Sequence, residues 1–204
     1  ADRLAAAWQP AATVRADAGG WSIEHHDAPR PELHPDLALL MSTSGSTGSP
    51  KLVRLSSANL VANATAIATA LGLTAADRGI TALPLHYCYG LSVLHSHLAV
   101  GAAVVVETAS VVDPCFADAL ARHGVTNIAT VGHMLDLLEV GGPERVHVPS
   151  LRLITQAGGR LAPDTAERWL TRTARWGVEF VQMYGQTEAT ARMAYLPPGL
   201  ARRQ

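Results

Sequence analysis

Short apolar runs alternate with stretches of helical hydrophobic spacing from about residue 36 onward. The apolar runs predict strands at Leu37–Met41, Gly79–Leu83, Ala102–Glu107, Val125–Thr130, Leu151–Gln156 and Val178–Met183. The helical spacing predicts helices at Ser56–Leu71, Gly90–Val100, Asp113–His123, His133–Val140 and Pro163–Trp176. Fully apolar strands between amphipathic helices predict an α/β fold, in which a mostly parallel sheet is flanked by helices on both faces.

The pattern divides the chain into three parts. Residues 1–36 are rich in Ala, Pro and charge, and predict an irregular leader with one short strand at Trp21–His25. Residues 37–195 form the α/β subdomain, and residues 196–204 are expected to be a frayed tail.

Three loops of unusual composition each follow a predicted strand directly. They are Thr43–Lys51, Gly158–Arg160 and Tyr184–Glu188. Because the carboxyl ends of parallel strands share one edge of a sheet, we expect these loops to gather there, where ligands of such folds bind.

Composition narrows the class of protein. The 204 residues are 48% hydrophobic and 16% charged, which excludes intrinsic disorder. A net charge of -1 gives no basic field to recruit nucleic acid. The apolar runs are too short to span a membrane, and two cysteines are too few for a disulfide framework. We therefore expect a cytoplasmic protein.

The loop Thr43–Lys51 contains the single lysine of this arginine-rich chain. Its glycines allow close backbone approach to a ligand, and its hydroxyls, amides and Lys51 suit a polyanion such as phosphate. Only two residues separate Gly45 from Gly48, so the loop is not the Walker motif that a P-loop phosphotransferase would carry. The alternative is a flexible Ser/Gly linker, which would not normally follow a buried strand at once.

Four segments together resemble the adenylate-forming enzymes, which include acyl-CoA synthetases, luciferases and peptide-synthetase adenylation domains. The loop Thr43-Ser44-Gly45-Ser46-Thr47-Gly48-Ser49-Pro50-Lys51 resembles their phosphate-loop motif, and Tyr184-Gly185-Gln186-Thr187-Glu188 resembles a second motif of the family. Pro84–Leu91 is similar to the acyl-pocket segment, and Leu151–Leu161 to the strand and turn that carry adenine. The resemblance extends from Leu37 to Arg192.

The resemblance implies that ATP activates a carboxylic acid to acyl-AMP with release of pyrophosphate. The acyl group then passes to a thiol of CoA or of a carrier protein's phosphopantetheine. The segment Gly79–Val106 contains no Asp or Glu, whereas amino-acid-activating relatives hold the substrate ammonium with an aspartate there. A fatty or aromatic acid is therefore expected; its identity is left open.

The resemblance also implies residue roles. The phosphate loop would hold the β- and γ-phosphates, Tyr184 would stack on adenine, Thr187 would bond the α-phosphate, and Glu188 would bind Mg²⁺. Catalytic roles fall on Lys51, Thr187 and Glu188. The expected ATP/AMP contacts are Thr43, Ser44, Gly45, Ser46, Thr47, Gly48, Lys51, Gly158, Gly159, Tyr184, Gly185, Gln186 and Thr187. The expected acyl pocket comprises His86, Tyr87, Gly132, His133 and Gly158.

The family pattern has parts that this sequence lacks: a later aspartate for the ribose and a C-terminal domain with a catalytic lysine. We therefore expect a fragment that is inactive alone, with an apolar surface that favours a homodimer. The competing hypothesis is a non-catalytic nucleotide-binding or interaction module derived from the same family.

Overall fold

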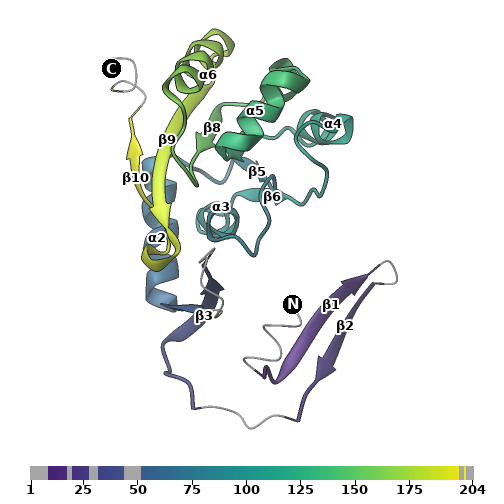
Figure 1. Cartoon of the computed structure of the whole chain (residues 1–204), viewed down its shortest axis with the longest axis vertical. Coiled ribbons are helices and arrows are strands. Elements are labelled where there is room, and N and C mark those ends of the chain that lie inside the picture. The colour runs from purple at the N-terminus through teal and green to yellow at the C-terminus, as the bar shows by residue number, and fades with distance from the viewer. Residues whose placement is uncertain (1–8, 18–19, 28–31, 44–51, 198–199, 201–204) are drawn as a thin grey trace.

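The computed structural model describes residues 9–17, 20–27, 32–43, 52–197 and 200 (Figure 1). Its centre is a six-stranded sheet with strand order β10-β9-β8-β7-β5-β6. The strands of this sheet are β5 (Arg78–Ile80), β6 (Ala103–Val105), β7 (Asn127–Thr130), β8 (Leu153–Gln156), β9 (Glu179–Gln186) and β10 (Ala191–Leu196). All neighbouring pairs are parallel except β10 with β9, so the expected mostly parallel sheet is confirmed.

The predicted helices are present with small shifts in their ends. They are α2 (Ser57–Ala70), α3 (Cys88–Leu98), α4 (Pro114–His123), α5 (Gly132–Gly141) and α6 (Pro163–Trp176), with 3₁₀ turns η1 (Pro143–Val146) and η2 (Thr187–Ala189).

Local capping chemistry explains where several helices begin and end. Ser56 and Asn59 form a reciprocal capping box at the start of α2, and the Asp113 carboxylate accepts the Cys115 amide at the start of α4. Gly124 and Gly177 end α4 and α6 in the left-handed conformation that glycine adopts without steric cost.

Helices cover both faces of the sheet, as expected. Leu153 of β8 packs in one apolar cluster with Ile67 and Leu71 of α2. The next residue, Ile154, points to the opposite face and packs in the larger cluster that contains Trp169 of α6. Figure 1 shows α4, α5 and α6 grouped on this second side, away from α2.

The segment before α2 differs from the sequence expectation. Strand β3 (Leu37–Ser42) pairs antiparallel with β4 (Leu52–Ser56) in a separate two-stranded sheet, so it does not belong to the parallel sheet. The short run Leu52–Ser56 was not expected as a strand, and the loop at Thr43 therefore connects two strands rather than a strand and a helix.

The leader contains two strands where the sequence indicated one. The expected strand at Trp21–His25 is β2 (Gly20–His25), and it pairs antiparallel with β1 (Ala12–Asp17). All six residues of β2 are exposed, so its weak patterning reflects the absence of a buried face among the described residues.

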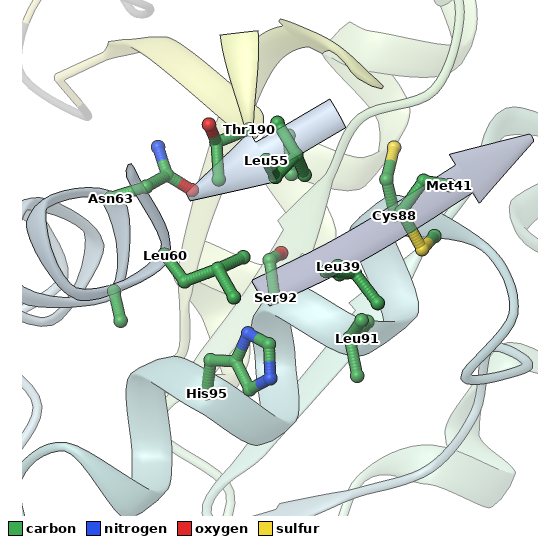
Figure 2. A pocket seen from close by; sticks show the side chains of 12 residues that line it. Leu39, Met41, Leu55, Leu60, Asn63, Cys88, Leu91, Ser92, His95 and Thr190 are labelled. Atoms are coloured by element: carbon green, nitrogen blue, oxygen red, sulfur yellow. The ribbon is translucent and has the colours of Figure 1, made fainter. Parts of the chain in front are cut away.

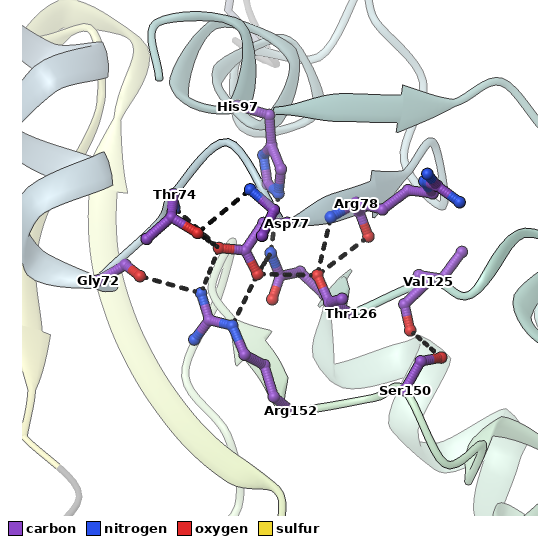
Figure 3. Close-up of polar contacts among 11 residues, drawn as sticks. Gly72, Thr74, Asp77, Arg78, His97, Val125, Thr126, Ser150 and Arg152 are labelled. Carbon is purple, nitrogen blue, oxygen red and sulfur yellow. Dashed lines mark hydrogen bonds and ion pairs between the residues drawn. The ribbon is translucent and has the colours of Figure 1, made fainter. Parts of the chain in front are cut away.

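A buried polar cluster fixes the amino ends of the parallel strands (Figure 3). Asp77, beside β5, accepts hydrogen bonds from the Arg152 guanidinium at 2.7 and 2.8 Å, from Thr126 Oγ1 at 2.9 Å and from the Thr74 amide at 2.8 Å. Burial raises the pKa of Asp77, but these donors outweigh it and hold the pKa well below its usual range. The cluster therefore binds β5, β7 and β8 together at their amino ends, opposite the edge that carries Gly158–Arg160 and Tyr184–Glu188.

Candidate functional site

A cleft of about 990 Å³ opens at the carboxyl ends of β8 and β9. Its walls come from the turn after β8, the end of β9 with η2, the start of α3, and β10. The residues that line it are Thr43, Tyr87, Cys88, Gln156, Gly158, Gly159, Arg160, Leu161, Gln182, Met183, Tyr184, Gly185, Gln186, Thr187, Glu188, Ala194, Tyr195 and Leu196. Segments more than 100 residues apart in the chain thus meet at one edge of the sheet, where an α/β fold binds ligands.

The turn after β8 requires glycine at position 158. Gly158 has φ +84°, and a Cβ there would lie 2.5 Å from the Tyr87 hydroxyl oxygen. Gln156 Nε2 donates to the carbonyls of Ala157 and Gly159, at 3.2 and 3.1 Å, and so holds the turn closed. The bare backbone of this turn forms one wall of the cleft.

The end of β9 carries the second wall. Tyr184 lines the cleft with 62% of its surface exposed, which leaves its ring face free for stacking. A Cβ on Gly185 would lie 1.6 Å from the Ala191 carbonyl oxygen, so only glycine allows β10 to pair this closely with β9. Tyr184–Glu188 was expected to be a loop; its first three residues are the end of β9, and Thr187 and Glu188 begin η2.

The start of α3 meets η2 across the cleft. Thr187 Oγ1 donates to Cys88 Sγ at 3.3 Å, which ties the turn to the first residue of α3. Tyr87, the residue before it, is half-buried, and burial raises the pKa of its phenol. Its ring lies edge-on to Tyr89 with centroids 6.2 Å apart, so the cleft wall here is aromatic.

The hairpin β3–β4 brings Thr43 to the same cleft. Its side chains Leu39, Met41 and Leu55 pack on Leu60 of α2 and Leu91 of α3 (Figure 2). The space left between them is about 20 Å³, room for about one water molecule. This contact is therefore packing rather than a ligand site, and it fixes the hairpin whose end is Thr43.

The charges at the cleft suit a phosphate with Mg²⁺. Among the described lining residues, Arg160 is the one cation and Glu188 the one carboxylate. No group of three or more His, Cys, Asp and Glu side chains that could hold a metal occurs in the described parts of the chain. A single carboxylate fits Mg²⁺, which commonly binds one or two protein carboxylates together with substrate phosphates.

The family model described as AMP-binding enzyme matches residues 2–204. The chain belongs to this family of AMP-binding enzymes. The resemblance to adenylate-forming enzymes inferred from the motifs is thereby confirmed.

Similar AMP-binding enzymes include acid–CoA ligases. The chain is 36% identical over 170 residues to a sulfoacetate–CoA ligase of Cupriavidus necator, which covers 81% of this chain and 32% of that protein. It is 30% identical over 175 residues to a 2-succinylbenzoate–CoA ligase of Enterococcus faecalis, with coverage of 86% and 35%. The solved O-succinylbenzoate CoA synthetase of Bacillus subtilis in complex with ATP and magnesium superposes with a TM-score of 0.70 at 31% identity, over 89% of this chain and 37% of that one. The chain thus spans about a third of the length of these relatives.

The structure brings part of the predicted site together. Of the predicted ATP/AMP contacts, Thr43, Gly158, Gly159 and Tyr184–Thr187 line the cleft, together with Tyr87 of the predicted acyl pocket and the predicted metal ligand Glu188. The other eight residues of the predicted phosphate loop lie outside the described part of the chain, and they include the expected contacts Ser44, Gly45, Ser46, Thr47, Gly48 and Lys51.

Three predicted acyl-pocket residues do not line the cleft. His86 is exposed in the turn before α3, and His133 is exposed at the second position of α5. Gly132 begins α5, where a Cβ would meet Leu161 at 3.7 Å. The helix start directs His133 outward, so Tyr87 is the residue of the predicted pocket that faces Gly158.

Four polar residues that line the cleft were not assigned a role from the sequence: Gln156, Arg160, Gln182 and Tyr195. For Gln156 and Arg160 the signal was position, because they flank Gly158 and Gly159 at the carboxyl end of a predicted strand.

No helix within the described residues is both long and apolar enough to cross a lipid bilayer.

Proposed function

We propose that this chain supplies the nucleotide-binding part of an enzyme that activates a carboxylic acid with ATP. The products are acyl-AMP and pyrophosphate, and the acyl group then passes to the thiol of CoA or of phosphopantetheine. The observation that carries the proposal is the convergence of Thr43, Gly158, Tyr184 and Glu188 on one cleft. Membership of the AMP-binding family and similarity to acid–CoA ligases support it.

In this proposal, each wall of the cleft contacts a different part of the nucleotide. The exposed Tyr184 ring stacks on adenine, and the bare backbone at Gly158 and Gly159 lies along its edge. The Thr187 hydroxyl, now directed to Cys88 Sγ, turns to an α-phosphate oxygen when the nucleotide enters. Arg160 offsets phosphate charge from the opposite wall.

Thr43 and Glu188 face the triphosphate end of the nucleotide. The predicted phosphate loop begins at Thr43 and extends to Lys51. Glu188 holds Mg²⁺, which when bound neutralises the phosphate oxygens and makes pyrophosphate a better leaving group. Their shared cleft lets both act on one triphosphate.

The acid itself lies on the Tyr87 side of the cleft in this proposal. Tyr87, Leu161 and Met183 give this wall aromatic and apolar surface. Glu188 is the single carboxylate among the described lining residues, and it is assigned to the metal. No second carboxylate among them could hold the ammonium group of an amino-acid substrate, and the one cation is Arg160. A fatty or aromatic acid therefore fits better than an α-amino acid.

The test is a pyrophosphate-release screen of fatty, aromatic and amino acids with the protein expressed from its complete gene. The Glu188→Gln variant should lose activity, whereas Glu179→Gln, an exposed carboxylate at the other end of β9, should retain it. In parallel, the 204-residue chain should bind ATP by calorimetry only weakly without Mg²⁺. If no acid releases pyrophosphate but ATP still binds, the chain belongs to a non-catalytic nucleotide-binding module instead.

A further inference from the structure

Arg192 is a buried cation beside the candidate site. It follows η2 as the second residue of β10, and only 5% of its surface is exposed. No carboxylate pairs with it within the described residues. A cation costs free energy to bury, so the contacts that compensate it show which arrangement of the chain it stabilises.

Those contacts all come from elements that frame the cleft. Nε donates to Ser92 Oγ at 3.1 Å, and Nη2 donates to the Ser92 carbonyl at 3.1 Å and to Ser96 Oγ at 3.2 Å. The guanidinium carbon lies 5.3 Å from the centre of the Tyr89 ring, a cation–π distance. On the far side Nη1 reaches Met183 Sδ of β9 at 3.7 Å. The guanidinium thus joins α3, β9 and β10.

The segment immediately before Arg192 is strained. Thr190 has φ +65° and Ala191 has φ +92°, conformations that side-chain-bearing residues rarely adopt. Such a turn persists only where the surrounding structure holds it. Ala191 is buried against Gly185, and the Arg192 carbonyl accepts a hydrogen bond from Asn63 Nδ2 at 2.7 Å. These contacts hold the backbone in place at the end of the strained turn.

We infer that Arg192 is a positioning residue of the candidate site. Its guanidinium ties β10 to α3 and so holds the strained turn that presents Thr187 and Glu188 to the cleft. A lysine cannot replace it, because one ammonium does not offer the planar fork that reaches Ser92, Ser96 and Met183 together. The role in catalysis rests on the proposed function, whereas the role in holding the turn does not.

The two cysteines allow a test that needs no enzyme activity. Cys88 accepts the Thr187 hydroxyl and is half-buried beneath the turn, whereas Cys115 is exposed on α4 and serves as an internal reference. The rates at which N-ethylmaleimide labels each are measured by mass spectrometry in the folded chain. In Arg192→Lys, labelling of Cys88 relative to Cys115 should accelerate at least about tenfold, the effect of losing one or two hydrogen bonds of a charged group.

A matched control separates positioning from general stability. Arg152→Lys removes another partly buried guanidinium, at the opposite edge of the sheet, and should leave the labelling ratio of the cysteines unchanged. If Arg192→Lys does not fold, Ser92→Ala combined with Ser96→Ala removes two of the same hydrogen bonds and keeps the cation. An unchanged Cys88 ratio in the folded variants overturns the inference.

Activity supplies the second readout, in the protein from the complete gene. Arg192→Lys should lower kcat for pyrophosphate release about tenfold or more, with little change in KM for the acid, because Thr187 and Glu188 act on the nucleotide. An equal rise of KM and fall of kcat would contradict positioning. If the wild-type protein neither binds ATP nor releases pyrophosphate, the proposed function fails, and the Cys88 labelling still decides the role of Arg192.

Discussion

The contact between Gly158 and Tyr87 gives a quantitative test of how the cleft is built. Gly158→Ala places a Cβ 2.5 Å from the Tyr87 hydroxyl and 3.1 Å from Val131 Cγ1, at a backbone φ of +84°. Two costs therefore add. The left-handed backbone costs an L-residue about 1–2 kcal/mol, and forcing Tyr87 aside costs about 1–3 kcal/mol as overpacking.

The two costs can be separated with a second substitution. Tyr87→Phe removes the hydroxyl, so the next atom of that ring, Cζ, lies 3.6 Å from the new Cβ, an ordinary contact. In the Tyr87→Phe background, Gly158→Ala should therefore cost less than in the wild type. The recovered part is the steric cost of the Tyr87 hydroxyl, about 1–2 kcal/mol of coupling between neighbours. The backbone cost and the 3.1 Å contact with Val131 Cγ1 remain.

Urea unfolding of the four proteins measures both terms, provided that the dependence on denaturant concentration stays constant. Gly159→Ala is the control: a Cβ at Gly159 meets nothing within 4 Å, so its effect should stay below about 0.5 kcal/mol. If Gly158→Ala costs the same with and without the Tyr87 hydroxyl, the steric reasoning is wrong. If Gly159→Ala costs as much as Gly158→Ala, the reasoning from backbone conformation is wrong too.

Three further predictions follow from named side chains. Asp77→Asn should lower the free energy of unfolding at pH 7 by about 3 kcal/mol, since it breaks a buried pair whose arginine is partly exposed. Because the folded pKa of Asp77 lies below its ordinary 3.8, its stabilisation is complete above that pH and is lost as the pH falls below it. Denaturant titrations of the Asn variant between pH 2 and 5 should accordingly show a flatter acid limb. Burial lowers the pKa of His97, so the wild type should also lose stability as the pH falls below 6.5. The His97→Gln variant should lose less stability over the same pH range. If the unfolding free energy depends on pH equally in both proteins, His97 is already solvated in the folded state. Tyr184→Ala should change stability by less than about 0.5 kcal/mol, because the ring is exposed. The same change should weaken ATP binding in calorimetry by about 1–3 kcal/mol, the value of one lost base–aromatic stack, and unaltered affinity would argue against stacking.

Much of the sheet could be predicted because its pattern is local. Strands such as Asn127–Thr130 and Leu153–Gln156 are buried on both faces, and apolar pairs such as Ile128–Ala129 and Leu153–Ile154 lie within them. Helix α6 has the predicted bounds, since Pro163 can begin a helix and Gly177 ends it. The pairing of β3 with β4 was not predictable in the same way, because a five-residue run before a helix resembles an extended linker until its partner strand is known.

The residues of the candidate site also differ in how far the sequence alone could predict their positions. Tyr184–Glu188 and Gly158–Gly159 were predicted from sequence motifs of fixed spacing, and they line one cleft in the structure. His86 and His133 were placed in the acyl pocket by resemblance, yet both are exposed and do not line the cleft, because the direction of a side chain at a turn or helix start depends on local backbone geometry that a motif match does not specify.

The sequence by itself determined the family, the order of the helices and of the parallel strands, and the glycines at which the backbone must turn, because each of these depends on neighbours along the chain. Only the tertiary structure decided that Tyr87 meets Gly158 and that Arg192 reaches Ser92 across 100 residues. Those contacts depend on how β10 pairs back onto β9 and how α3 lies against them. Contacts between distant segments do not produce a periodic pattern of residues in the sequence, so residue spacing alone does not predict them.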